Sequence, residues 1–152
     1  MNKVQTFELI EEMKKSNEFQ MHKIELLLDG KEVDELTTVP KTECDFGKLL
    51  YPNELHLRNV LGSLFYEKID FFHEKWHEEY NKIYKIFEEY LKSKNEKKGF
   101  FSKLIGDKKV SEMDIDRAKL YYSELKATST ELIKTIEMCQ RRVNALSESK
   151  FE

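Results

Sequence analysis

Hydrophobic residues recur every three to four positions in three stretches of the chain, which predicts three long helices. The first covers residues 3–29, and the glycine at position 30 suits a C-terminal cap. The second covers residues 54–92 and the third residues 112–147. The repeating residues of the first two are Phe7, Ile10, Met13, Met21, Ile24 and Leu28, then Leu61, Phe65, Ile69, Phe72, Trp76, Ile83, Phe87 and Tyr90.

The third stretch has a heptad pattern. Two sets of apolar residues recur in it at seven-residue spacing, as in helices that pack along a seam. This spacing fits a helix that packs on its own chain, and it fits a dimer seam equally well. The two sets are Ile115, Tyr122, Ile136 and Val143, and Ala118, Leu125, Leu132, Cys139 and Leu146.

The segments between these stretches lack helical periodicity. Pro40 argues against a helix through residues 30–43, and "CDFGKLLYPN" at residues 44–53 predicts a short helical turn that ends at Pro52. Residues 96–111 form a connector that is basic with an apolar centre. Because no segment has a convincing strand pattern, the predicted fold is all-α: an antiparallel helical bundle with a long C-terminal heptad helix.

Composition supports a helical fold and excludes some function classes. Of 152 residues, 36% are charged, and there are only 5 Gly and 2 Pro. The formal net charge of −3 gives no overall attraction to nucleic acid. No apolar run approaches the roughly 20 residues of a membrane span, and acidic residues occupy the place of a signal peptide's apolar stretch. We therefore expect a cytoplasmic protein with no membrane span, whose two cysteines are thiols.

The candidate chemistry centres on "FFHEKWHEEY", in which His73 and His77 lie four residues apart on one helix face. Such a pair can bind one metal ion, or it can be two ordinary histidines with other hydrogen-bond partners. His22 on the first helix and Cys44 between helices offer two further donors of the kind that zinc prefers. The four together could close a tetrahedral zinc site.

The order of these donors resembles the chemoreceptor zinc-binding (CZB) domain family. The matching residues are His22, "CDFGKLLY" from Cys44 to Tyr51, and "HEKWH" from His73 to His77. The resemblance covers roughly residues 15–92, and Leu49 departs from it, since the family usually has Trp there. It implies a helical domain that holds one zinc ion through three His and one Cys. Family members are attached to chemoreceptors or diguanylate cyclases, are often dimeric, and respond to zinc or to oxidants such as hypochlorous acid.

These observations predict a non-enzymatic zinc-binding sensory or regulatory module of bacterial chemotaxis or cyclic-di-GMP signalling. Its metal ligands would be His22, Cys44, His73 and His77. We expect a CZB-like bundle at residues 1–95, the connector at 96–111 and the heptad helix at 112–152. A homodimer and a signalling partner of chemoreceptor or cyclase type are expected. The alternative is a structural or adaptor bundle with a purely structural zinc ion.

"HEKWH" also matches the His-Glu-x-x-His pattern of zinc metalloproteases, in which the Glu activates water. Here charged Lys75 and Glu78 interrupt what is usually a buried helix, and no strand is predicted that could align a peptide. A fourth protein ligand at Cys44 would also fill the position that catalytic water needs. We therefore expect Glu74 to be a surface charge or a hydrogen-bond partner of a ligand imidazole. His56 is expected at the surface, and Cys139 as a small buried apolar residue.

Overall fold

A computed structural model describes residues 1–33, 36–96 and 110–151. These residues form helices and connections with no strand among them, so the predicted all-α class is confirmed. None of the described helices has an apolar stretch long enough to cross a membrane. In chain order, the elements are α1 (Lys3–Leu28), α2 (Asp45–Leu50), the 3-10 turn η1 (Tyr51–Asn53), α3 (Glu54–Leu61), α4 (Ser63–Glu96), α5 (Glu112–Ala145) and the 3-10 turn η3 (Glu148–Phe151).

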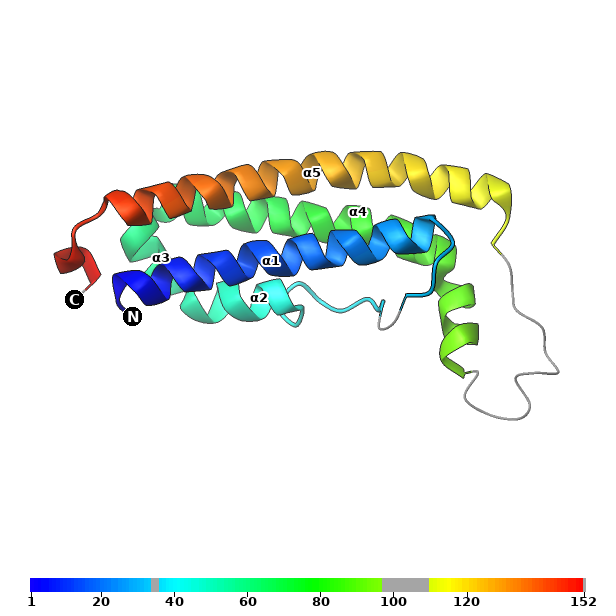
Figure 1. Cartoon of the computed structure of the whole chain (residues 1–152), viewed down its shortest axis with the longest axis horizontal. Helices are drawn as coiled ribbons and strands as arrows, with labels where there is room; N and C mark the ends of the chain where they lie inside the picture. The colour runs from blue at the N-terminus through cyan, green and yellow to red at the C-terminus, as the bar shows by residue number, and fades with distance from the viewer. Residues whose placement is uncertain (34–35, 97–109, 152) are drawn as a thin grey trace.

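The helix α5 runs antiparallel to both α1 and α4 and packs against each of them (Figure 1). Hydrogen bonds show the register with α1: Ser129 donates to Asn17, and Gln140 donates to Glu11 further along α5. Since α1 and α4 run in the same direction, the chain between them has to return along the bundle. Residues 36–53, which lead to α3, make that return, and α2 within them packs on α1.

Local signals explain where α1 begins and ends. Asn2 accepts a hydrogen bond from the backbone of Gln5, whose side chain bonds back to the Asn2 backbone, which is a complete capping box. At the other end Gly30 has a positive φ of 75°, and the Lys31 N–H donates to the Leu26 carbonyl. Only a residue without a Cβ adopts this conformation freely, so the predicted cap at Gly30 is confirmed.

The predicted single helix over residues 54–92 is wrong in one respect: it is divided at Gly62 into α3 and α4. Gly62 has a φ of 94°, outside the helical range, and its N–H donates to the Arg58 carbonyl to close α3. The apolar pattern gives no sign of this break because Leu61 and Ile69 are both buried on either side of it. The helix α4 also continues past the predicted end, to Glu96.

Most of the heptad residues are buried within the same chain, while Ile115, Tyr122 and Leu146 are half-buried. Ala118, Leu125, Leu132 and Cys139 are all fully inaccessible to solvent, and α5 contacts both α1 and α4. This burial accounts for the pattern without a second copy of the chain. The dimer therefore stays a prediction. Of the predicted connector at residues 96–111, positions 97–109 lie outside the described residues.

A layer of buried polar side chains separates the core into two hydrophobic clusters. One cluster lies towards the start of α1 and contains Met13, Leu50, Ile69 and Leu132, and the other contains Trp76 and further residues of all three long helices. Burying polar groups is costly unless they are hydrogen-bonded, so such a layer points to a structural or functional role. Its members are Asn17, His73, Glu79, Thr128 and Ser129.

Candidate metal centre

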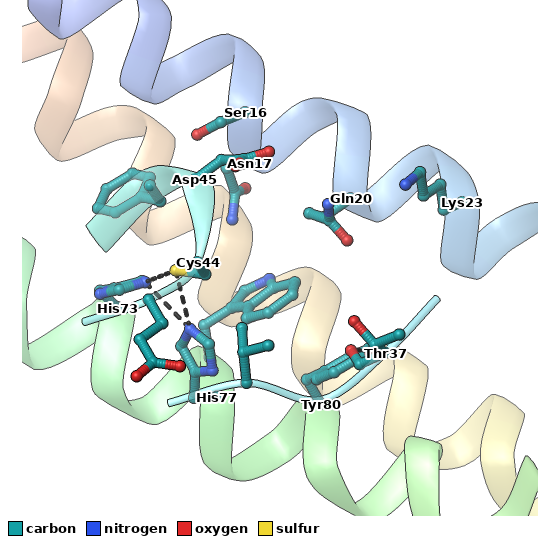
Figure 2. A pocket seen from close by; sticks show the side chains of 14 residues that line it. Ser16, Asn17, Gln20, Lys23, Thr37, Cys44, Asp45, His73, His77 and Tyr80 are labelled. Atoms are coloured by element: carbon teal, nitrogen blue, oxygen red, sulfur yellow. Dashed lines mark hydrogen bonds between the residues drawn. The ribbon is translucent and has the colours of Figure 1, made fainter. Parts of the chain in front are cut away.

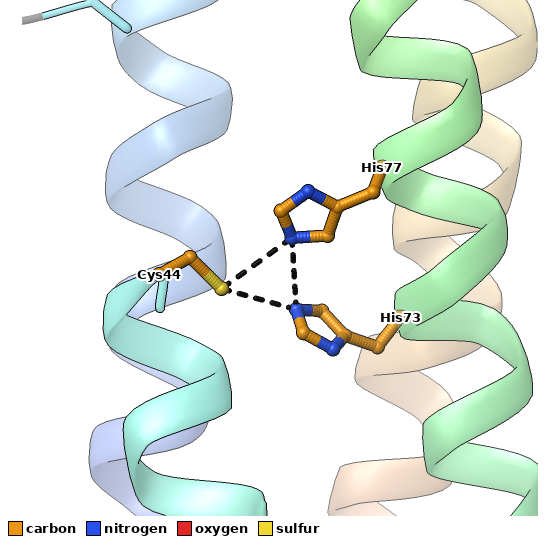
Figure 3. A group of neighbouring side chains, drawn as sticks. All are labelled: Cys44, His73 and His77. Carbon is orange, nitrogen blue, oxygen red and sulfur yellow. Dashed lines mark hydrogen bonds between the residues drawn. The ribbon is translucent and has the colours of Figure 1, made fainter. Parts of the chain in front are cut away.

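Cys44, His73 and His77 converge at this polar layer (Figure 3). The Sγ of Cys44 lies 3.3 Å from Nε2 of His73 and 3.4 Å from Nε2 of His77. The two Nε2 atoms are 3.1 Å apart. One sulfur and two imidazole nitrogens thus form a nearly equilateral triangle between α4 and the start of α2.

The dimensions of this triangle match one face of a zinc coordination tetrahedron. With Zn–S of about 2.3 Å and Zn–N of about 2.05 Å, tetrahedral angles place two nitrogens about 3.3 Å apart and sulfur about 3.6 Å from each. The observed edges are 3.1, 3.3 and 3.4 Å. A thiolate with two imidazoles is also a donor set that suits zinc. The three residues therefore fit a metal ion of this kind.

The helix α4 supplies two of the donors because His73 and His77 are one turn apart. His73 shares a heptad position with Tyr80 and Phe87, and all three are buried, with exposed fractions of 1%, 4% and 3%. This face of α4 therefore points into the core. His77 is half-buried beside it, with its ring edge-on to that of His73.

Cys44 is fixed by the turn that starts α2. Its sulfur caps the helix by accepting the N–H of Gly47 at 3.3 Å, and its thiol donates to the carbonyl of Lys41. Gly47 is required here because a Cβ at this position would lie 1.8 Å from the Lys41 carbonyl oxygen. The Gly in "CDFGKLLY" therefore allows residues 41–44 to fold back and direct the sulfur towards α4.

A hydrogen-bonded chain orients the His73 ring. Tyr51 Oη donates to the Asp70 carboxylate at 2.6 Å and lies 3.2 Å from Nδ1 of His73. Since the phenol has one proton and gives it to the carboxylate, it accepts the second bond, and Nδ1 of His73 carries the hydrogen. The Nε2 lone pair is then free and directed at Cys44 and His77. Lys41 Nζ lies 3.3 Å from the same Asp70 oxygen and neutralises it.

Burial sets the charge of the donors. It lowers the pKa of His73 to about 3, an effect that neighbouring His77 and Lys41 add to and Asp70 opposes. Burial and Lys41 lower the pKa of His77 as well. Both imidazoles are therefore neutral and able to donate lone pairs at pH 7. Burial raises the pKa of the Cys44 thiol against the opposing Gly47 N–H, so an arriving metal ion has one proton to displace.

The three donors line a pocket of about 430 Å³ (Figure 2). It lies between α1, α4 and residues 41–44, which we call the Cys44 segment. From α1 it is bounded by polar residues, among them Asn17, Gln20 and Lys23. The side-chain oxygen of Asn17 accepts a 2.5 Å hydrogen bond from Ser129 of α5. The pocket is therefore lined both by the three donors and by Asn17, which is hydrogen-bonded to α5.

The structure does not bring His22 into the donor group. Its side chain is exposed and lines a different pocket, with Tyr122 and Lys126 of α5. The reason is helical phase: Met21 and Ile24 of the same helix are buried, and residue 22 is rotated about 100° from residue 21. The α1 side chains that line the pocket with Cys44, His73 and His77 include Asn17, Gln20 and Lys23 instead.

Three other residues singled out from the sequence lie outside the group. His56 is half-buried rather than exposed and lies 2.8 Å from the Thr6 hydroxyl. Cys139 is fully buried among apolar side chains as expected, and burial raises the pKa of its thiol to about 12. The Glu74 side chain is 57% exposed, lies 3.8 Å from Lys41 Nζ and does not line the pocket. It is thus a surface charge in an ion pair, as expected.

Asp70 and Lys41 are site residues that the sequence patterns did not indicate. Asp70 lies three residues before His73 and therefore on the same face of α4. That spacing, with a carboxylate beside a candidate imidazole ligand, is a signal that could have found it. Lys41 gave no such signal, since its position depends on the fold of an aperiodic segment.

Protein-family models, curated proteins and solved structures were each compared with the chain, and none matches it. What the structure establishes is a helical bundle in which a Cys/His/His group could hold a metal ion.

Proposed function

We propose that this protein is a zinc-binding regulatory module whose metal ligands include Cys44, His73 and His77. The triangle of donors with edges of 3.1–3.4 Å is the observation that carries this proposal. Three further features support it: neutral imidazoles, a capped sulfur and a tyrosine–aspartate pair that orients one ring. A histidine pair without such a role would not need this support.

Regulation would depend on the Cys44 segment. Residues 41–44 are joined to α4 through the three donors and, more weakly, through the ion pair of Lys41 with Asp70. Zinc supplies a strong cross-link between these elements, worth on the order of ten kcal/mol in four-ligand zinc modules. Loss of the metal leaves the segment attached mainly by packing of Phe46 and Leu50, which are buried in the core. A change in this attachment would be the output of the module.

Two signals can change the attachment. One is the supply of zinc. The other is an oxidant such as hypochlorous acid, which takes two electrons from the Cys44 thiolate to give a sulfenic acid and chloride. A sulfenic acid is a poorer zinc ligand than a thiolate, so either signal releases the same segment. Cys44 is half-buried and lines the pocket, which gives a small oxidant access to it.

The resemblance of His22, "CDFGKLLY" and "HEKWH" to the CZB family supports bacterial chemotaxis or cyclic-di-GMP signalling as the context. A cytoplasmic location, a homodimer and a partner of chemoreceptor or cyclase type belong to the same proposal. His22 is the part of the resemblance that the structure supports least, because it lies away from the donor group.

A structural or adaptor bundle is the second candidate, and exposed residues of α5 favour it. Met113 and Leu120 are seven residues apart and 81% and 70% exposed. They could contact a partner while zinc only holds the fold. The two candidates differ in one measurement, which is partner binding or oligomeric state with and without zinc. An unchanged result in a protein that stays folded favours the adaptor.

Metal analysis of purified protein tests the proposal directly. We expect one equivalent of zinc in the wild type and loss of it in Cys44→Ser, His73→Gln and His77→Gln. Cys139→Ser is the matched control, since that thiol is buried away from the group, and it should retain zinc. Full zinc content in the first three variants would disprove the site. To test the oxidant as a signal, hypochlorous acid is added to the zinc-loaded protein. It should release zinc from the wild type and equally from Cys139→Ser, since both retain the Cys44 thiolate.

A further inference from the structure

The donor group supplies three ligands, whereas zinc in proteins is almost always four-coordinate. Among the described residues, no other His, Cys, Asp or Glu joins Cys44, His73 and His77 in a group that could hold a metal. If the proposed zinc site is right, the fourth ligand comes from a side chain that moves, from a residue outside the described ranges or from outside the protein.

The nearby protein donors are poorly placed for this position. The Asn17 oxygen, which would be its ligating atom, is engaged by the Ser129 hydroxyl in a buried hydrogen bond. His22 lies on the flank of α1 that faces α5. Moving it towards Cys44 would require α1 to rotate and expose Met21 and Ile24, which are buried in the core. Gln20 is half-buried at the edge of the pocket and is the one α1 donor that needs a separate control.

The space beside the donors is large enough for an added ligand. A pocket of about 430 Å³ adjoins all three of them, whereas one water molecule occupies about 30 Å³ in the liquid. The amide nitrogen of Asn17 is directed towards Cys44 in this pocket (Figure 2). Because its oxygen is held by Ser129, this nitrogen remains as a hydrogen-bond donor facing the site.

Charge favours an anion as the ligand. Two neutral imidazoles, one thiolate and a divalent ion sum to a net charge of +1. Lys23 lines the same pocket and adds a second positive group, and the Asn17 amide adds a donor. Glu43 and Asp45 also line the pocket, but both are exposed at its rim, where solvent screens them.

We infer that the pocket between α1 and the Cys44 segment binds a small anion, which completes the coordination of a metal ion held by Cys44, His73 and His77. This inference rests on the proposed zinc site and deepens it. The module then has a coordination position that exchanges with solvent. Asn17, which lines the pocket, accepts a hydrogen bond from Ser129 of α5. An anion bound in the pocket would therefore contact a side chain that is bonded to the long C-terminal helix.

Cobalt substitution with azide as the probe tests this inference. Cobalt(II) in place of zinc gives visible absorption bands that report its ligands, and a thiolate band that reports Cys44. We expect azide to change the visible bands saturably while the thiolate band persists. His22→Ala should have the same starting spectrum and the same response. Lys23→Gln should bind azide about threefold to fivefold more weakly, as for loss of one partly screened charge.

The outcomes separate this inference from the proposed function. If cobalt and zinc both fail to bind, the metal site itself is wrong and the inference falls with it. If the metal binds but azide causes no change, the site stands and the exchangeable position is disproved. A changed starting spectrum in His22→Ala, or an azide response that appears only in Gln20→Leu, would identify that residue as the fourth ligand and overturn the inference.

Discussion

The two flanks of α1 face different chemistry. On one flank, Cys44, His73 and His77 approach within 3.4 Å of one another beside a polar pocket. On the other, His22 lines a pocket of about 490 Å³ against α5, near a hydrogen bond from Tyr122 to Glu25. Histidines of the sequence motif lie beside both flanks, His73 and His77 on α4 and His22 on α1, but only one flank faces a group of donors. The difference teaches that the order of ligands along a chain does not decide which side of a helix each one occupies.

The largest expected effect comes from substituting residues on the two flanks in turn. His73→Gln and Cys44→Ser each remove one of three donors, so we expect zinc affinity to fall by about a thousandfold or more. His22→Gln removes an exposed side chain of the other flank and should change affinity by less than about threefold. Competition with a chromogenic chelator measures all three. An equal loss of zinc affinity in His22→Gln would mean that His22 is a zinc ligand. The two flanks of α1 would then not differ in metal binding.

Removing zinc is expected to have the next largest effect, on stability. A ligand at a thousand times its dissociation constant stabilises the folded state by about 4 kcal/mol. For a chain of this length that is a rise in Tm of about 8–16 °C. Thermal unfolding with zinc and with a chelator measures it. His77→Gln should show almost no difference between the two conditions. A persistent difference in that variant would mean that zinc stabilises the protein from another place.

Much of the fold follows from periodicity, because burial of apolar residues is what forms these helices. The buried positions of α5 and the inward face of α4 that holds His73, Tyr80 and Phe87 are visible in the sequence for this reason. Gly62 is not, since the apolar pattern continues across it while the backbone turns. A positive φ at one glycine cannot be distinguished from a tolerated helical glycine by pattern alone.

The donor group is partly visible in the sequence. His73 and His77 share a face by spacing, and Cys44 is a plausible partner because it precedes a helical turn. The phase of α1 was also available, since Met21 and Ile24 mark the buried side and place His22 beside it rather than on it. What sequence patterns do not contain is the course of residues 36–44. That course decides which flank of α1 meets Cys44, and it depends on non-local contacts such as that between Tyr80 and the Thr37 carbonyl.

The tyrosine–aspartate pair gives a smaller and more specific prediction. Tyr51→Phe removes the acceptor of the His73 Nδ1–H, and Asp70→Asn removes the carboxylate that holds the phenol proton. Groups of this kind are worth tenfold to a hundredfold in metal affinity, so a loss in that range is expected from each. Tyr122→Phe is the matched control on the other flank of α1, where the phenol bonds Glu25, and it should leave zinc affinity unchanged.

The outcome that would contradict this role is an equal effect of the two tyrosines. Loss of zinc affinity in Tyr122→Phe as well as in Tyr51→Phe would mean that both act through general loosening of the bundle. A double variant sharpens the result. Because Tyr51 and Asp70 act on the same imidazole nitrogen, the combined loss should be smaller than the sum of the separate losses in free energy.

The smallest expected effect is a pH dependence of the metal-free protein. Burial lowers the pKa of His73 from its ordinary 6.5 to about 3. Between these two pH values the imidazole is protonated in the unfolded chain but stays neutral in the folded chain. The contribution is therefore fully present above pH 6.5 and is lost as the pH falls below it. Between pH 6.5 and 5.5 it amounts to about 1 kcal/mol of unfolding free energy. Denaturant unfolding of the chelated protein at both pH values measures it.

In His73→Gln, the fall in unfolding free energy between pH 6.5 and 5.5 should become smaller by this amount. It should not vanish, because His77 and His56 remain and their pKa values are also lowered in the folded protein. The same slope in the variant and the wild type would show that His73 is not held in its neutral form by the fold. The arrangement of Cys44, His73 and His77 would then form only when the metal binds, and would not exist in the metal-free protein. In that case the free Nε2 lone pair, the Tyr51 hydrogen bond and the buried ring would follow zinc binding instead of preceding it.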